Sequence, residues 1–148
     1  MKETWSIVML ISGALFAGGV IPIAWQRAPA WRAADHAHFR TEFEHTLRRV
    51  DQLQPAALLI WLVSTVGFAS SPSGTDRAIA AIAAACLLAV LVGSVTSLVP
   101  IQRRPTDQRS DLSAADVDRL RTRWLAGHLI RTIVVLAAFV ALVIAAVM

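Results

Sequence analysis

The last quarter of the chain carries a row of side chains that could do chemistry together. They share one face of a helix because steps of three, four and three residues separate them: Arg121, Trp124, His128 and Arg131. The seventeen residues after Arg131 carry no charge, so its guanidinium is expected just inside a membrane boundary, where ionisable residues are usually functional. An imidazole there could transfer a proton, and a guanidinium could stabilise an anionic or enolate oxygen. The competing interpretation is that Arg131 extends to the membrane surface and that His128 has no role.

A second polar stripe lies earlier, within residues 34–52, whose periodicity is that of an amphipathic helix. Its members are also three or four residues apart: Asp35, His38, Glu42, His45 and Arg49. Glu42 and His45 form a Glu-x-x-His unit of the type used in carboxylate-bridged metal bundles, and imidazole with carboxylate suits zinc, iron or copper. One hypothesis is a copper or iron site with the ligands His38, Glu42, His45 and His128. The alternative is a solvated face whose side chains exchange hydrogen bonds, with no cofactor.

The same segment has an apolar stripe beside the polar one, formed by His36, Phe39, Phe43, Leu47 and Val50. This face is expected against the mouth of a helical bundle or in the lipid headgroup layer. The row of side chains that begins at Arg121 is expected at the same membrane depth as this helix. The two helices could therefore enclose one pocket with aromatic walls for a flat, apolar substrate. The expected substrate contacts are Arg121, His36, Phe39 and Phe43.

Composition indicates that lipid is the main solvent of this protein. Of its 148 residues 56% are hydrophobic and only 16% are charged, and the mean hydropathy is +0.59. The charges are gathered into a few segments, whereas a soluble domain needs them over its whole surface. A net charge of +4 could suit nucleic acid, but the chain has no recognisable nucleic-acid-binding module, so we expect no nucleic-acid partner. The single Cys86 excludes an intramolecular disulfide.

These features predict an all-α fold, namely a four-transmembrane-helix bundle with an additional amphipathic cytoplasmic helix between spans 1 and 2. A span needs about 20 mostly apolar residues. The last helix is expected to begin before its span, because Ser113-Ala114-Ala115-Asp116 resembles a capping box, and to run on to Met148. The four spans belong to a single membrane domain, 1–148, and lie at about 5–25, 55–71, 78–101 and 125–148.

The distribution of arginine and lysine predicts the orientation in the membrane. Two loops, 26–54 and 102–124, hold five and six of these residues, which is 11 of the 14 in the chain. The positive-inside rule therefore makes both loops cytoplasmic and places both termini outside the cell (inner) membrane. The lipid bilayer is thus an expected partner, and a homo-oligomer is a further expectation for so small a membrane protein.

Three segments carry a pattern that extends beyond single residues. They are Gly13-Ala14-Leu15-Phe16-Ala17-Gly18-Gly19, then Val99-Pro100-Ile101-Gln102-Arg103-Arg104, and then Leu120-Arg121-Thr122-Arg123-Trp124 followed by His128 and Arg131-Thr132. Together they resemble the anthrone-oxygenase-like family of small four-helix membrane proteins, although Gln102 stands where that family often has asparagine. The resemblance implies oxygen-dependent oxidation of a phenolic or polycyclic aromatic compound in the biosynthesis of aromatic metabolites. It also implies that four residues are catalytic: Arg123, Trp124, His128 and Arg131.

The leading hypothesis is therefore an oxygenase-like membrane oxidoreductase that acts on a small aromatic or apolar substrate at the cytoplasmic mouth of the bundle. His128 would serve as base or metal ligand, and Arg131 or Arg123 would hold the developing oxyanion. Trp124 would form a wall. The alternative is a non-enzymatic membrane partner subunit or a small transporter. Transport is less favoured, because the expected spans lack a charged pair near the bilayer midplane and an evident pair of broken helices.

Overall fold

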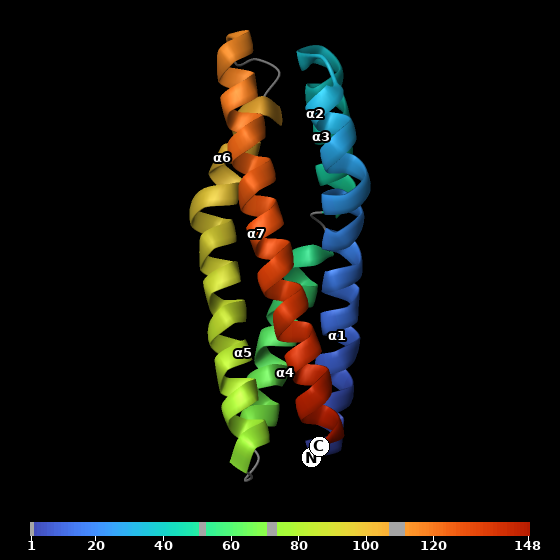
Figure 1. Ribbon diagram of the computed structural model, residues 1–148, viewed down its shortest axis with the longest axis vertical. Helices are drawn as coiled ribbons and strands as arrows, with labels where there is room; N and C mark the ends of the chain where they lie inside the picture. Colours follow the sequence, from blue (N-terminus) through green and yellow to red (C-terminus); the bar gives the residue numbers. More distant parts are fainter. Residues whose placement is uncertain (1, 51–52, 71–73, 107–111) are drawn as a thin grey trace.

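The computed structural model describes residues 2–50, 53–70, 74–106 and 112–148, and all regular secondary structure among these residues is helical. Figure 1 shows a long, narrow bundle in which α7 runs along the whole length and both chain ends lie at the same end. Two short elements, η1 and η2, are π-helical turns, which are one residue wider than an α-helical turn. In chain order the elements are α1 Lys2–Pro22, η1 Ile23–Arg27, α2 Ala28–Ala33, α3 His36–Val50, α4 Gln54–Ala69, α5 Gly74–Gly93, η2 Ser94–Leu98, α6 Val99–Thr106 and α7 Ala114–Val147.

Among the described residues, three continuous helices are long and apolar enough to cross a membrane: Lys2–Ala33, Gly74–Pro105 and Ala114–Val147. The first joins α1, η1 and α2 end to end, and the second joins α5, η2 and α6. α4 has 16 residues and reaches the necessary length only together with α3, from which it is bent by 47°. Large apolar side chains are exposed on the outward faces, including Leu15 and Ile82, which a bilayer would cover. The protein is thus an all-α membrane protein.

Both π-helical turns stand directly before a proline. Pro29 is the second residue of α2, and Pro100 is the second residue of α6. The ring of a proline inside an α-helix clashes with the carbonyl four residues earlier, which here belongs to Trp25 in η1 and to Thr96 in η2. A wider turn moves that carbonyl away, so each helix continues past its proline. Both turns contact α7.

Two apolar cores follow one another along the bundle. The first lies in the candidate spans and includes Phe16, Trp61 and Leu142. A Cβ on Gly13 would lie 2.8 Å from the Trp61 ring, so only glycine allows α1 and α4 to approach this closely. The second core lies toward the end of the bundle away from the chain termini, where α2, α3, η2 and the charged first third of α7, residues 114–124, meet (Figure 1). Its large members are Trp31, Phe39, Phe43, Leu98 and Trp124.

Two of the predicted helices are present in the structure. α3 coincides with the amphipathic helix expected within residues 34–52, and its stripe of Phe39, Phe43 and Leu47 is buried against the bundle. α7 is the continuous last helix, and its N-cap is Ser113, whose Oγ accepts a hydrogen bond from the Asp116 N–H at 3.2 Å.

The predicted loops 26–54 and 102–124 are largely helical in the structure. The first loop contains α2 and α3, and the second contains the end of α6 and the start of α7. Part of the second loop, 107–111 with Arg109, lies outside the described residues, as does Ser71 at the end of the predicted second span.

Candidate functional site

His128 is buried in the centre of the bundle, with 1% of its surface exposed. Its Nδ1 lies 2.8 Å from Nη2 of Arg131, and its Nε2 lies 3.2 Å from the carbonyl oxygen of Val20 on α1. A guanidinium can only donate, so Nδ1 accepts from Arg131 and the ring carries its proton on Nε2, which donates to Val20. The indole of Trp124 stacks on the imidazole with the ring centroids 4.9 Å apart and the planes at 10°. Both nitrogens and one face of the ring are therefore engaged.

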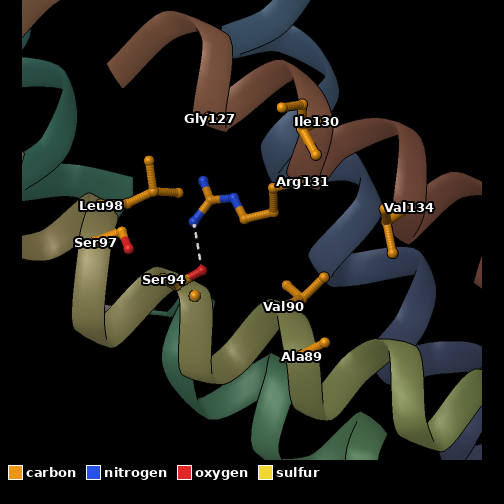
Figure 2. Close-up of a pocket in the computed structure, with 10 residues that line it drawn as sticks. Ala89, Val90, Ser94, Ser97, Leu98, Gly127, Ile130, Arg131 and Val134 are labelled. Carbon is orange, nitrogen blue, oxygen red and sulfur yellow. Dashed lines mark hydrogen bonds between the residues drawn. The ribbon is translucent and has the colours of Figure 1, made fainter. Parts of the chain in front are cut away.

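Arg131 extends from α7 toward η2. Its Nη1 makes a long contact of 3.5 Å with Oγ of Ser94, the first residue of η2. Figure 2 shows the guanidinium between Leu98 and Ser94, with Ile130 and Val134 on the helix behind it. The cationic end of the side chain is thus held between His128 on its own helix and the π turn of the neighbouring helix.

Two cavities meet at Arg131. The outer cavity has a volume of about 290 Å³, lies between α5, η2 and α7, and is walled mostly by apolar side chains such as Val90 and Ile130. The inner cavity has a volume of about 350 Å³ and lies where α1, α4, α5, η2 and α6 converge on Arg131. Three residues line both cavities and form the wall between them: Ser94, Leu98 and Arg131.

A glycine on α7 shapes this wall. A Cβ on Gly127 would lie 2.6 Å from Cδ2 of Leu98, so the missing side chain allows Leu98 to press against α7. The two cavities are consequently separated by side chains and not by backbone.

The inner cavity also has polar side chains that sequence analysis did not connect with Arg131. Gln54, the first residue of α4, donates from Nε2 to the carbonyl oxygen of Phe16 at 3.3 Å, and its Oε1 is buried without a hydrogen-bond partner among the described residues. A Cβ on Gly19 would lie 1.7 Å from that Nε2, so Gly19 makes room for the amide. Gln102 and Arg103 of α6 line the same cavity.

The predicted substrate contacts on α3 form a packed aromatic cluster instead of an open pocket. Phe39 and Phe43 are fully buried, and Phe43 meets the Trp124 ring edge-to-face at a centroid distance of 4.8 Å. Trp31 of α2 completes the cluster, 5.9 Å from Trp124. The aromatic walls expected around a substrate thus fill the space between α2, α3 and α7 themselves, because rings of this size pack together when no ligand separates them.

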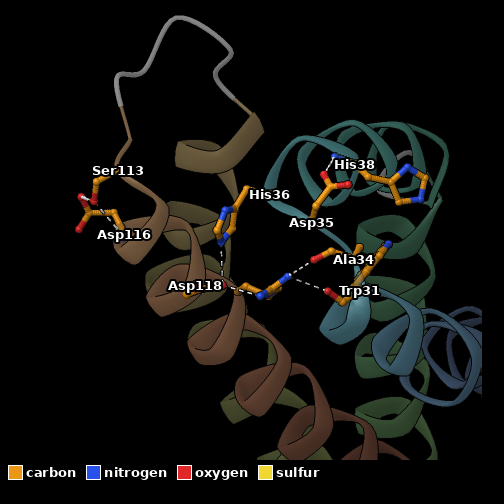
Figure 3. A network of polar contacts seen from close by, with 9 residues as sticks. Trp31, Ala34, Asp35, His36, His38, Ser113, Asp116 and Asp118 are labelled. Carbon is orange, nitrogen blue, oxygen red and sulfur yellow. Dashed lines mark hydrogen bonds and ion pairs between the residues drawn. The ribbon is translucent and has the colours of Figure 1, made fainter.

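Arg121 holds α2 and α7 together. Its Nη1 donates to the carbonyl oxygens of Trp31 and Ala34 at 3.0 and 2.8 Å, where it satisfies carbonyls at the end of α2, and its Nη2 binds Asp118. His36 lies 3.2 Å from the same carboxylate (Figure 3). The hydrogen bond from His36 is the largest cause that lowers the pKa of Asp118; desolvation opposes it, and the charge of Arg121 lowers the pKa further.

The structure does not bring the four predicted metal ligands together. His128 is in the bundle core, whereas His38 and His45 are exposed on α3, and Glu42 binds Arg27 at 3.3 Å. Asp35 caps α3, since its Oδ1 accepts from the His38 N–H at 2.8 Å. In the described part of the chain, no three His, Cys, Asp or Glu side chains lie close enough to hold a metal ion. Both carboxylates of the stripe are thus engaged, Asp35 in the helix cap and Glu42 in the ion pair with Arg27.

Arg123, the remaining predicted catalytic residue, is exposed on α7, one residue away from buried Trp124, and it does not line either cavity. Sequence analysis missed Ser94, Leu98 and Gln54. Two sequence features could have indicated them. Polar residues occur within or at the start of apolar helices, in Ser94-Val95-Thr96-Ser97 and Gln54-Pro55, and Pro100 lies inside a continuous helix.

A sequence model of a protein family, described as anthrone oxygenase, matches residues 43–141, which is 99 of the 148 residues. The match includes His128, Arg131, Ser94 and Gln54. No curated protein and no solved structure matches the chain.

Proposed function

The chain belongs to the anthrone oxygenase family, and from this premise we propose that it is an integral membrane oxidoreductase that oxidises a small aromatic substrate with molecular oxygen. An anthrone carries a CH₂ group between two aromatic rings, opposite a ketone. Oxidation replaces both hydrogens with one oxygen atom of O₂, and the other oxygen atom leaves as water. Such a substrate is apolar and would reach the protein through the bilayer.

One observation supports this proposal above all: the guanidinium of Arg131 borders an otherwise largely apolar cavity between two helices. Transfer of a proton from the CH₂ group to water or hydroxide turns the ketone into an enolate oxygen. A fixed guanidinium stabilises such an oxygen more strongly in a poorly solvated site than in water. The volume of about 290 Å³ is at the lower limit of ligand pockets, which suits a small, flat molecule. Arg131 is the proposed catalytic residue.

His128 acts through Arg131 in this proposal. Both of its ring nitrogens are engaged, so its role is to hold Nη2 of the guanidinium, while the Trp124 indole fixes the plane of the imidazole. Ser94 holds the other end of the guanidinium. His128 is therefore a positioning residue, and the general base of the sequence-based hypothesis is not needed at this position.

The membrane arrangement is part of the proposal. We infer that α4 is the fourth span and that α3 bends away from it at the membrane surface, with the arginine-rich segments in the cytoplasm and both termini on the other side of the cell (inner) membrane. Cysteine labelling from each side would test this orientation, with Cys86 first replaced by alanine. Labelling of Thr4→Cys and Arg119→Cys from the same side would contradict it.

The function is tested with the purified protein in nanodiscs, supplied with an anthrone and oxygen, by following O₂ consumption and the absorbance of the quinone product. Arg131→Gln should lower kcat by about 100- to 1,000-fold, as expected for the loss of a principal oxyanion donor. Arg131→Lys keeps the positive charge but loses the forked N–H donors of the guanidinium, so its kcat should lie between those of the wild type and Arg131→Gln. Arg119→Gln is the matched control, since Arg119 is exposed on the same helix and pairs with Asp116.

Full turnover of a folded Arg131→Gln variant would refute this site. A wild-type protein that binds the anthrone without oxidising it would favour the alternative, a non-enzymatic membrane partner subunit or a small transporter.

A further inference from the structure

A basic pocket lies between α1, η1 and α3. It has a volume of about 340 Å³. Its floor is formed by Gly18 and Gly19, and its polar side chains are Gln26, Arg27, His45 and Arg49.

The cations of this pocket are incompletely neutralised. Arg27 pairs with Glu42 at 3.3 Å. Arg49 and His45 form no hydrogen bond or ion pair with any described residue. Two arginines against one carboxylate leave the pocket with an excess of positive charge, and each of these side chains offers N–H donors, so the pocket suits an anion.

An apolar groove continues from this pocket. It has a volume of about 430 Å³ and lies between α1 and α4, with Leu15, Ala57 and Ile60 among its walls. The pocket and the groove share two residues, Gly19 and Arg49, so they adjoin each other and together form one depression along α1. One end is cationic and the other is apolar.

The depression is oriented as a lipid molecule would be. Trp25 is 81% exposed beside the basic end, which is where interfacial tryptophans lie. From Gln26 at that end to Leu15 in the groove there are eleven residues, or roughly 16 Å at about 1.5 Å per residue. This length matches the hydrocarbon of one leaflet, about half of a 30 Å core.

We propose that this depression binds one anionic phospholipid, with the phosphate held by Arg27, His45 and Arg49 and an acyl chain in the groove between α1 and α4. Charge complementarity selects a negative headgroup, and the groove selects a ligand with a chain over a free phosphate ion. This site is separate from Arg131, and its existence does not depend on the oxidase activity.

The test is native mass spectrometry of the detergent-solubilised protein titrated with phosphatidylglycerol, with phosphatidylcholine or with inorganic phosphate. Wild-type protein should retain phosphatidylglycerol in preference to phosphatidylcholine. Arg49→Gln should lower the affinity for phosphatidylglycerol about fivefold, which corresponds to about 1 kcal/mol for one arginine near a charged membrane surface. Arg32→Gln, which removes an exposed charge at the same end of the bundle, should leave it unchanged.

A second variant separates loss of the site from loss of the fold. A Cβ on Gly18 would meet no atom within 4 Å, so Gly18→Leu should fold normally while filling the floor of the basic pocket. It should displace phosphatidylglycerol with an unchanged melting temperature in detergent. Equal binding of both lipids, equal effects of Arg49→Gln and Arg32→Gln, or phosphate binding as tight as that of the lipid would each overturn the proposal.

Discussion

Two substitutions at His128 distinguish a positioning role from acid–base catalysis. Asparagine places an amide oxygen close to where the imidazole has Nδ1, and glutamine places an amide nitrogen close to where it has Nε2. His128→Asn can therefore still accept from Nη2 of Arg131, whereas His128→Gln can still donate to the Val20 carbonyl but leaves the guanidinium without its acceptor. Neither amide can act as a general base.

The expected magnitude follows from the bond that each variant keeps. A hydrogen bond to a charged group contributes about 1.5–3 kcal/mol, and each 1.4 kcal/mol is about tenfold in rate when the loss falls on the transition state. His128→Gln should then lower kcat by about 10- to 100-fold through a displaced Arg131. His128→Asn should keep most of kcat and lose stability instead, because it gives up the stacking on Trp124 and the bond to Val20.

The assay is anthrone oxidation in nanodiscs, with KM and kcat measured separately and the melting temperature of each variant measured in the same preparation. A positioning role predicts that His128→Asn exceeds His128→Gln in kcat. If both variants lose activity equally and completely while remaining folded, His128 takes part in proton transfer and the positioning role is wrong.

Other regions of the bundle give further expectations. Phe43→Ala should destabilise the protein by about 3–5 kcal/mol, because this ring is fully buried in the aromatic cluster; the melting temperature in detergent measures the loss. Arg121→Gln should lower the free energy of unfolding by about 1.5–3 kcal/mol and increase hydrogen exchange in α2 and α3. Exchange unchanged from that of the wild type would show that the capping contacts do not stabilise these helices. The pKa of Asp118 is lowered in the folded state, so its ionised form stabilises the fold above its unfolded pKa of about 4 and this contribution disappears as the pH falls below that value. Exchange in α3 should rise at low pH in the wild type, and an equal rise in Asp118→Asn would contradict this. Gly127→Ala should displace Leu98 and join the two cavities. The variant should then accept a larger substrate than the wild type does.

The sequence pattern within a single helix was sufficient to predict features that depend on that helix alone. The periodicity of residues 34–52 predicted α3, and the sequence around Ser113 predicted where α7 begins. The pairing of His128 with Arg131 was also within reach, because three residues of one helix separate them. In each case the interacting groups belong to one element, so helical geometry alone brings them together.

The rest depends on contacts between elements. Val20 is 108 residues from His128, and nothing in the sequence near either residue indicates that the imidazole donates to that carbonyl. The predicted metal ligands are not brought together for a similar reason, because Glu42 pairs with Arg27 on another helix and Asp35 caps α3. Polar side chains take the nearest good partner, and a stripe on a helical wheel does not show which partners the fold supplies.

In each of the two long helices that contain a π turn, the turn rotates the side-chain faces after it relative to those before it. Each turn absorbs one residue, so a helical wheel drawn straight through Ser94–Leu98 assigns Gln102 and Arg103 to faces about 100° away from those they occupy. The apolar stretch before the turn can thus match lipid while the polar stretch after it is aimed independently at the inner cavity. Loss of one residue from η2 would bring the carbonyl four residues before Pro100 back against the ring of the proline. A deletion of one residue, which would hardly alter a hydropathy plot, would in this way disrupt the side-chain wall that Arg131 forms with its neighbours in η2.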